Sequence, residues 1–467
     1  MHVTDLQGIG LHVPYDQMDP LVIAEVKCRL MDGIIALAGG ALSVRKESLE
    51  TLCAVAKAEP EVRPVFPVNM RTSLEMAAFL NAFFIRSADW GDTFRRDNGI
   101  GGHPSDQVAA ILALCDAPDV SGRLIIELMH LAYQFFTLLQ VRMFATQPTF
   151  DYTSTLSLTT PVLAAVRFGA SPERVQAALN LSAACGAMLG QVRPSDITNM
   201  KSGASACTIS GGFRCYRLSE ALKAPASIFE GKWGWYKLIA PLEGGLVTIG
   251  NDATYMPSEV KTFPCFHVGQ TPVECAVALY EQIGAAGGTK QIKSVAIHVS
   301  EIDAPYIDLF GKKQFPENQS EADHHLIFCL AIALRCGALT PLHYSDAYFG
   351  DTEIRRLISI TEVQSQPFDT ADQEAQKGAC RLEVMLKNGK VLQESRLRAE
   401  GTFYGLSSAE RLAQLKKVVD RKRSMLEKAG RFDFSPVSNS VDELEKYDGR
   451  TLLDLIHKVL SDQMIIV

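Results

Sequence analysis

The chain lacks an excess of positive charge. Its 467 residues include 46 Lys and Arg against 53 Asp and Glu, which gives a formal net charge of -7. Nucleic-acid binding depends on a basic surface, and the longest basic clusters here, "FRR" and "VVDRKRS", are short. We therefore expect no nucleic-acid partner.

Targeting signals and long apolar stretches are also lacking. No apolar run is expected to reach the ~18 residues that a membrane span needs. The start, "MHVTDLQGIGLHVPYDQMDP", has neither the basic and apolar regions of a secretory signal nor the Arg-rich, acid-poor composition of a transit peptide. We expect no membrane partner and a cytoplasmic location, with a mitochondrial location as the alternative.

Spacings typical of metal sites are missing as well. The 11 cysteines form no CxxC motif, and the 10 histidines form no HExxH or HxH pattern. Cys185, Cys207 and Cys329 lie in apolar helical runs, which is typical of buried reduced thiols. The sequence therefore predicts neither disulfides nor a bound metal.

Helical patterns fill the first half of the chain, from Leu21 to about Leu222. "GRLIIELMHLAYQFFTLLQVRMF" is apolar nearly all round, which predicts a central buried helix. Thr72 and Glu75 have capping-box spacing at the start of another helix, and Ser171 with Pro172 starts a third. No dinucleotide-binding fingerprint follows any strand, so this half predicts a helical bundle.

The pattern changes after about Asn251. "IKSVAIHVSEI" alternates like a strand, and "CRLEVMLKNGKVLQESRL" predicts a hairpin around Asn388 and Gly389. "ADHHLIFCLAIALRCGAL" predicts a helix between them, and helical patterns return from Ser407. The prediction is a mainly α protein with an inserted α+β domain. Residues 1–254 form the helical domain, 255–397 the α+β domain, and 398–467 a helical return onto the first bundle.

One stretch between two helical runs is strongly polar and reads "DWGDTFRRDNGIGGHPSD". Its Pro104 suits a first helical turn, and the N–H groups of such a turn can bind an anion beside His103. Asp89 offers a carboxylate and Thr93 a hydroxyl. Composition alone leaves two interpretations open, a solvated surface loop and a functional site.

Other polar groups also have two interpretations each. Lys261 and His267 in "VKTFPCFHVGQT" fit a polar linker or a cleft at a domain junction. Lys201 in "NMKSGAS" is a solvated first-turn residue or a functional lysine in an unfavourable position for the helix dipole. His324 and His325 in "SEADHHLIF" point to different faces of a helix, so one faces solvent and the other either solvent or a cleft. Asp151 is most simply a helix N-cap.

Taken in order, these stretches resemble the MmgE/PrpD family. The resemblance runs from about Asp32 to Tyr344 and is carried by "DWGDT" with "GHPSDQVAAILAL", by "KTFPCFHVGQTPVECAV" and by "ADHHLIFCLAIALRCGALTPLHY". It implies a large helical domain with a smaller α+β lid domain, an active site in the cleft between them, a homodimer, and chemistry without metal or cofactor.

The resemblance also implies an activity. The leading expectation is dehydration of a 2-alkylcitrate, a tricarboxylate, to the corresponding alkyl-aconitate. Decarboxylation of cis-aconitate and non-catalytic binding of a polycarboxylate are the alternatives. The expected base is His103 or Asp89 and the expected acid His267 or His324. In full, the expected catalytic residues are Asp89, His103, His267 and Tyr152, and the expected substrate-binding residues are Thr93, Lys201, Lys261, Gln270 and His324.

The chain departs from the family pattern in places. Asp151 and Tyr152 stand where an aspartate–histidine pair is expected, and Phe328 stands where a tyrosine is expected. The loop between Thr93 and His103 is longer than usual, and we expect its middle, "RRDNGIG", to be a solvated excursion. The alkyl group stays open, because Phe150, Phe328 and the "WGWY" stretch (233–236) fit either an apolar pocket or a core.

Overall fold

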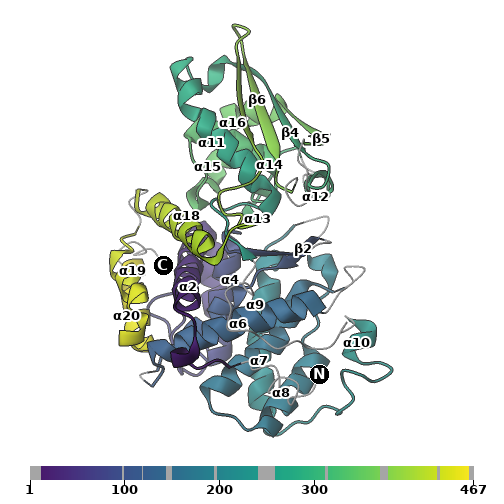
Figure 1. Ribbon diagram of the computed structural model, residues 1–467, viewed down its shortest axis with the longest axis vertical. Helices are drawn as coiled ribbons and strands as arrows, with labels where there is room; N and C mark the ends of the chain where they lie inside the picture. Colours follow the sequence, from purple (N-terminus) through teal and green to yellow (C-terminus); the bar gives the residue numbers. More distant parts are fainter. Residues whose placement is uncertain are drawn as a thin grey trace.

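The structure, a computed structural model, describes residues 12–96, 99–117, 119–142, 150–193, 197–239, 258–310, 314–368, 377–428 and 432–461. Figure 1 shows two bodies stacked along the long axis, a larger helical one below and a smaller one containing a sheet above. The predicted mainly α fold with an inserted α+β domain is confirmed. The predicted domain boundaries stay predictions, and the one at 254 and 255 lies outside the described residues.

The larger body, which we call the helical domain, combines the first half of the chain with its last described helices. Leu415, Val441 and Leu453 of the last helices belong to the same hydrophobic core as the first helices. The helices are α2 (Pro20–Ser43), α3 (Lys46–Val55), α4 (Leu74–Ser87), α5 (Asp106–Leu114), α6 (Gly122–Arg142), α7 (Leu156–Arg167), α8 (Pro172–Cys185), α9 (Met200–Leu218), α10 (Trp235–Leu238), α18 (Ser408–Lys428), α19 (Ser435–Asp442) and α20 (Gly449–Ser461). Short 3-10 turns lie at Tyr15–Gln17, Tyr152–Thr155, Gly190–Val192 and Leu444–Lys446.

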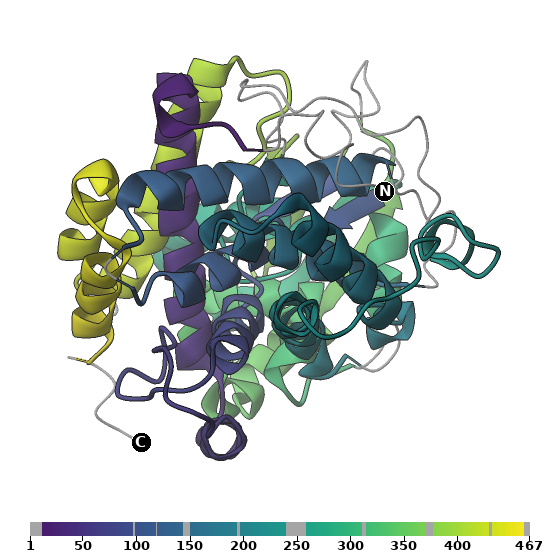
Figure 2. The same cartoon turned by 90° about the horizontal axis from the view of Figure 1, so that it is seen from below.

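Helix α6 lies in the core, as its all-round apolar sequence predicts, and crosses α2 when the molecule is seen from below (Figure 2). Its stretch Gly122–Val141 has a mean hydropathy of 1.4 and is long and apolar enough to cross a membrane. The expectation that no run reaches this limit was therefore wrong. However, 78% of the apolar window is buried inside the protein, as in the core helix of a globular domain.

Side-chain caps explain where several helices begin. Ser171 accepts a hydrogen bond from the Arg174 N–H at the start of α8, as predicted. The predicted cap Thr72 is wrong for α4, because Ser73 accepts from the Met76 N–H instead. Thr72 pairs with Val62 in an isolated β-bridge.

The smaller body, the lid domain, has its own hydrophobic core, which runs from Phe263 to Leu392. Its four-stranded sheet has the order β5-β4-β6-β7, with β4 and β5 parallel and the other pairs antiparallel. The predicted hairpin is confirmed at β6 and β7, where Gly389 has a φ of 87°. The strands are β4 (Ile292–Ser300), β5 (Thr361–Gln366), β6 (Cys380–Leu386) and β7 (Val391–Arg396), and the helices are α11 (Gln270–Ala285), α12 (Ala304–Phe310), α13 (Gln319–Ala322), α14 (Leu326–Cys336), α15 (Asp346–Phe349) and α16 (Thr352–Ser359). Short 3-10 turns lie at His267–Gly269, Thr289–Gln291 and Pro341–His343.

Helix α14 begins later than predicted. The predicted helix included "ADHH", but α14 starts at Leu326, and His325 caps it by accepting from the Phe328 N–H. Asp323 and His324 therefore lie in the short connection between α13 and α14.

A second, three-stranded sheet has the order β2-β1-β3. It pairs β1 (Thr93–Arg96) antiparallel with β2 (Gly99–Gly102) and with β3 (Ser258–Glu259). The stretch "RRDNGIG" is therefore not simply an excursion, because most of its backbone is paired in strands. Its residues 97 and 98 lie outside the described residues.

All 11 cysteines are free thiols, as predicted. The expectation of burial holds for Cys329 but not for Cys185 and Cys207, which are exposed. Cys185 ends α8, and Cys207 lies on the outer face of α9.

Candidate functional site

The loop after α4 adopts an unusual backbone conformation at Asp89. Asp89 has a φ of 47° and is the only non-glycine residue with positive φ in the part of the chain that the structure describes. Such a conformation costs roughly 1–3 kcal/mol and persists only where the surroundings enforce it. Strain of this kind concentrates at functional sites, which makes Asp89 the starting point for the geometry.

Two cations hold the Asp89 carboxylate. The Lys261 ammonium lies 2.6 Å from Oδ2 and donates to the Asp89 carbonyl at 3.0 Å, and Arg86 Nη2 lies 2.9 Å from Oδ1. All three side chains are at most 2% exposed. Burial raises the pKa of Asp89, but Lys261, Lys201 and Arg86 outweigh it and hold that pKa well below its ordinary value. Asp89 is therefore an ionised carboxylate that binds protons weakly.

A second ion pair joins the helical domain to the lid domain. Lys201 on α9 donates to Asp323 Oδ2 at 2.5 Å, and both side chains are buried. The other Asp323 oxygen contacts Nδ1 of His324. Lys201 is thus not the solvated first-turn residue of the simpler interpretation. It reaches across the junction to the connection before α14.

Asp89, Asp323 and His324 place potential ligand atoms within 4.8 Å of one another, so their geometry alone could hold a metal ion. Lys201 and Lys261 already contact the two carboxylates at 2.5 and 2.6 Å. A divalent cation would have to displace these ammonium groups or lie beside them. The donor set therefore favours a lysine-neutralised cluster over a metal centre.

His103 lies at the end of β2, beside the same cluster. Its Nδ1 is 2.5 Å from the Asp92 carbonyl oxygen and 3.4 Å from the Thr93 hydroxyl. A carbonyl only accepts, so Nδ1 carries the proton and Nε2 carries the lone pair. Burial lowers the pKa of His103 well below its ordinary value, and Arg86 and Lys261 add to this effect. The neutral imidazole is thus the stable form near neutral pH.

Tyr152 belongs to an adjoining network. Its hydroxyl donates to Asp106 Oδ2 at 2.8 Å, and Ser205 donates to the same oxygen at 2.7 Å. The Tyr152 ring lies edge-on to His103 with centroids 5.5 Å apart, and Gly102 permits this approach because an added Cβ would lie 2.2 Å from the ring. Burial raises the pKa of Tyr152, so its hydroxyl stays protonated. The preceding Asp151 accepts from the Thr153 N–H, which confirms its predicted role as N-cap.

Two predicted residues, His267 and Gln270, belong to the segment that leads into α11. His267 lies in the turn that leads into α11, and its Nε2 is 3.0 Å from Glu259 of β3. Gln270 was expected to bind substrate, but its side-chain amide accepts from the Phe263 N–H at 3.0 Å and donates to the Phe263 and Cys265 carbonyls. These backbone contacts occupy the amide, so Gln270 holds the Lys261–His267 segment in shape instead of presenting a group to a ligand.

The expected anion donors after His103 are already occupied. The Ser105 N–H donates to Asp92 Oδ1 at 2.9 Å, and the Asp106 N–H donates to the His103 carbonyl. Helix α5 begins only at Asp106, so Pro104 precedes its first turn. The prediction of a free helix N-terminus at this place was wrong, because the loop bonds to its own backbone and to Asp92.

Buried ion pairs and hydrogen bonds from other segments hold the Asp89–Thr93 loop in place. Asp92 contacts Arg29 of α2 at 3.1 Å, and Lys422 of α18 donates to the Trp90 carbonyl at 2.6 Å. Lys422 also pairs with Asp32 of α2. The Trp90 indole N–H donates to the Thr262 carbonyl at 2.9 Å, one residue from Lys261. Three distant segments therefore fix the loop that carries Asp89.

Two of the aromatic residues suggested for an alkyl pocket, Phe328 and Trp235, lie in hydrophobic cores. Phe328 is buried in the core of the lid domain and packs against Tyr344 and Phe349. Trp235 lies in the core of the helical domain, and Trp233 is 73% exposed. Phe150 pairs in an isolated bridge with Leu189. These positions favour the core interpretation for Phe328 and Trp235.

Sequence reasoning missed Arg86, which contacts Asp89 at 2.9 Å and lies 3.7 Å from Asp106. It is 1% exposed and is the cation shared by the Asp89 cluster and the Tyr152 network. A signal was present, because Arg86 is the only charged residue between Glu75 and Asp89 in an otherwise apolar helical run. A charge on the buried face of such a helix requires a buried partner.

Comparisons with known proteins agree with this layout. The family model for the MmgE/PrpD N-terminal domain matches residues 10–243, and the model for the MmgE/PrpD C-terminal domain matches residues 263–412.

Curated relatives are similar at low identity. A protein named 2-methylcitrate dehydratase from Escherichia coli (strain K12) is 26% identical over 313 residues, covering 63% of this chain and 64% of the relative. A probable 2-methylcitrate dehydratase from Saccharomyces cerevisiae is 25% identical, covering 60% and 58%. A mitochondrial 2-methylcitrate dehydratase from Yarrowia lipolytica is 26% identical, covering 63% and 60%. The chain thus spans less than two thirds of the length of these relatives. The two family models together cover most of this chain, which belongs to the MmgE/PrpD family.

Proposed function

We propose that the protein is a hydro-lyase that dehydrates a 2-alkylcitrate, such as 2-methylcitrate, to the corresponding alkyl-aconitate. The proposal is supported by the names of the similar curated proteins and by one structural observation. That observation is the group of three buried cations, Arg86, Lys201 and Lys261, gathered with His103 and His324 at the junction of two domains.

The cations suit a tricarboxylate. Carboxylates leave water at a high cost unless cations and N–H donors replace their hydration. Lys201 donates to one protein carboxylate, and Lys261 donates to the carboxylate and the carbonyl of Asp89, so each ammonium has at least one further proton to donate to a substrate. Removal of a proton beside a carboxylate builds negative charge, and cations fixed nearby stabilise that charge in the transition state.

His103 is the better of the two proposed bases. Its Nε2 holds a lone pair while Nδ1 donates to Asp92, and its lowered pKa keeps it neutral near neutral pH. Asp89 binds protons weakly and has Lys261 and Arg86 on its two oxygens. We therefore assign proton abstraction to His103 and the positioning of Lys261 to Asp89.

The acid that protonates the departing hydroxyl is one of three groups. His267 has Glu259 at 3.0 Å as a partner for a proton, and His324 contacts Asp323. Tyr152 stays protonated, but its hydroxyl already donates a hydrogen bond to Asp106. We favour His267 over His324, because burial and Lys201 lower the pKa of His324 and so disfavour the protonated form that a general acid needs.

A test uses the purified protein with 2-methylcitrate and, separately, with cis-aconitate. The expected result is formation of a conjugated alkene from 2-methylcitrate, followed by ultraviolet absorbance and mass loss of one water. Carbon dioxide release from cis-aconitate without net water loss would overturn the dehydratase proposal in favour of a decarboxylase.

Non-catalytic binding of a polycarboxylate is the alternative, and the occupied Tyr152 hydroxyl is what favours it. Tight citrate binding, measured by calorimetry, with no turnover of either substrate would support that alternative.

The homodimer and the cytoplasmic or mitochondrial location are also part of the proposal. Light scattering of the purified protein tests the first, and imaging of the tagged full-length protein tests the second.

A further inference from the structure

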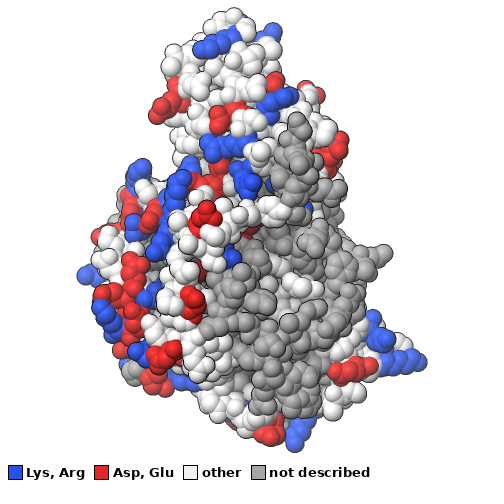
Figure 3. Space-filling model, in the orientation of Figure 1, with Lys and Arg blue, Asp and Glu red and all other residues white. Residues whose placement is uncertain are grey.

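A cavity of about 810 Å³ lies outside the site around Asp89, between the end of β7 and helix α18. Its lining is strongly basic, as it includes four cationic side chains and one carboxylate, that of Glu400. The cations are Arg396, Arg398, Lys417 and Arg421. In Figure 3, Lys and Arg side chains gather where the lid domain meets the helical domain, although the chain as a whole is acidic.

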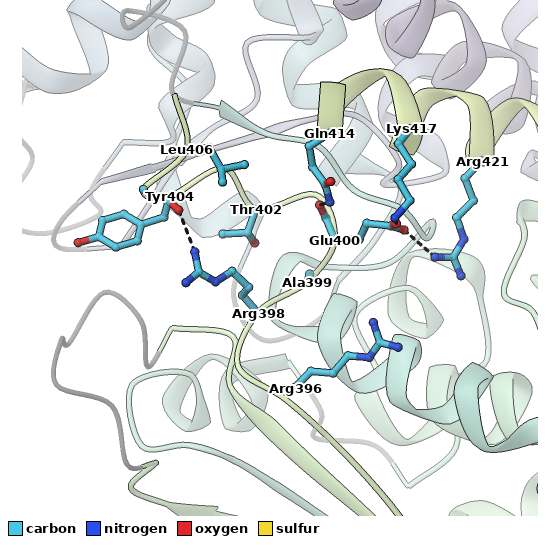
Figure 4. Close-up of a pocket in the computed structure, with 11 residues that line it drawn as sticks. Arg396, Arg398, Ala399, Glu400, Thr402, Tyr404, Leu406, Gln414, Lys417 and Arg421 are labelled. Atoms are coloured by element: carbon cyan, nitrogen blue, oxygen red, sulfur yellow. Dashed lines mark hydrogen bonds and ion pairs between the residues drawn. The ribbon is translucent and has the colours of Figure 1, made fainter. Parts of the chain in front are cut away.

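Glu400 does not neutralise this group. Lys417 lies 2.5 Å and Arg421 2.7 Å from its two oxygens, so one carboxylate serves two cations (Figure 4). Arg396 contacts Glu274 and Glu394 only at 3.4 Å. Arg398 donates to the Tyr404 carbonyl at 2.8 Å and has no carboxylate partner among the described residues. The positive charge therefore exceeds the negative charge on the cavity wall.

Neutral donors complete the wall. The side chain of Gln414 on α18 donates to the Glu400 carbonyl (Figure 4). Thr402 provides a hydroxyl from residues 397–407, the linker between β7 and α18. Several cations with hydroxyl and amide donors around one cavity suit a ligand with more than one anionic group, because guanidinium groups bind carboxylates and phosphates with two hydrogen bonds each.

The cavity is joined to the segment that carries Lys261. The Arg421 guanidinium lies 5.2 Å from the centre of the Phe263 ring, so Phe263 contacts the cavity wall while Lys261 contacts Asp89. The Val260 N–H donates to the Gly401 carbonyl at 3.1 Å, next to Glu400. A ligand that orders the linker therefore also orders the backbone beside Lys261.

We propose that this cavity binds a small multivalent anion, either a polycarboxylate or a phosphate compound, at a site separate from the one around Asp89. The proposal rests on the charges and contacts of the cavity and holds whichever reaction the Asp89 site performs. Binding at one site that orders a segment shared with another changes affinity at both, so the anion is also an effector of the Asp89 site.

The experiment measures binding of citrate and of pyrophosphate to the full chain by calorimetry, each at an ionic strength matched with sodium chloride. Because citrate also fits the site proposed around Asp89, only the binding that a variant of the cavity wall weakens is counted as binding at the cavity. Variant Arg398→Glu reverses the charge of one of the four cations on the cavity wall. Variant Lys390→Glu is the matched control, because Lys390 is exposed in the turn at the other end of β7. We expect the wild type and Lys390→Glu to bind alike and Arg398→Glu to bind at least tenfold more weakly.

The two anions distinguish the sources, since a preference for citrate indicates a polycarboxylate and a preference for pyrophosphate a phosphate compound. Hydrogen exchange of the Val260 amide should slow on binding in the wild type and not in Arg398→Glu. Equal binding by the wild type and Arg398→Glu, or no binding of either anion at millimolar concentration, would overturn the proposal. If Arg398→Glu melts at a lower temperature than the wild type, the neutral Arg398→Gln replaces it in the same comparison.

Discussion

At the scale of single residues, the chemistry depends on how charges are shared. Asp89 contacts two cations, Lys261 and Arg86, and its strained backbone places both its carboxylate and its carbonyl against Lys261. Burial lowers the pKa of Lys261, and Asp89 opposes that effect. An ammonium held in this way keeps protons available for a ligand, which a lysine fully paired with carboxylates does not.

His103 gives the most direct test at this scale. Replacing His103 with Ala removes the proposed base, so we expect turnover of the active substrate to fall by roughly 10²–10⁴-fold, the range for general base catalysis. Steady-state kinetics measure the fall, and the thermal midpoint checks that the variant is folded. The exposed His12, replaced with Ala, serves as control and should keep wild-type turnover. Full activity of His103→Ala would show that the base is another group.

At the scale of secondary-structure elements, the central helix α6 carries an unusual buried group. His130 is 0% exposed, and neither ring nitrogen has a hydrogen-bond partner among the described residues. Burial lowers the pKa of His130 to about 4. The unfolded chain has a histidine pKa of about 6.5, so it takes up a proton as the pH falls below that value while the folded chain does not.

The folded protein should therefore be less stable in acid. As the pH falls from about 6.5 to about 4, the buried His130 lowers the free energy of unfolding by up to roughly 3 kcal/mol. About 2 kcal/mol of this loss has occurred by roughly pH 5. Urea denaturation at neutral pH and near pH 5 measures this difference. In His130→Phe we expect the difference to shrink by about that amount. An identical acid response in His130→Phe would contradict the assignment.

At the scale of the whole molecule, the two bodies meet at buried charges. Lys201 comes from the helical domain and Asp323 from the lid domain, and neither has contact with bulk water. Removal of one partner of such a pair leaves the other charge buried and uncompensated. The junction therefore depends on both residues together.

Lys201→Met should destabilise the protein by about 3–5 kcal/mol, because Asp323 then stays buried without its cation. Adding Asp323→Asn should recover most of that loss, since no charge remains to be compensated. Urea denaturation followed by tryptophan fluorescence measures both, and the exposed Lys46→Met is the control. A double variant no more stable than Lys201→Met would show that the pair does not hold the junction.

The fold class followed from local patterns, whereas most contacts of the site did not. The Asn388–Gly389 hairpin and the Ser171 cap could be predicted because neighbouring residues determine them. The contact between Lys201 and Asp323 joins residues 122 positions apart, and no local pattern indicates it. The family resemblance brought Lys201 and Lys261 into the predicted site. It missed Arg86, and it gave Gln270 a substrate-binding role although backbone groups occupy its amide.

The contact of Lys422 with the Trp90 carbonyl has a consequence for biosynthesis. The two residues lie 332 positions apart, so the loop that bears Asp89 leaves the ribosome long before the lysine that fixes it exists. At 5–20 residues per second, that interval is roughly 20 to 70 s. During this time the nascent helical domain holds Asp32 without its cation, so the newborn chain is expected to acquire its finished loop only after translation of α18.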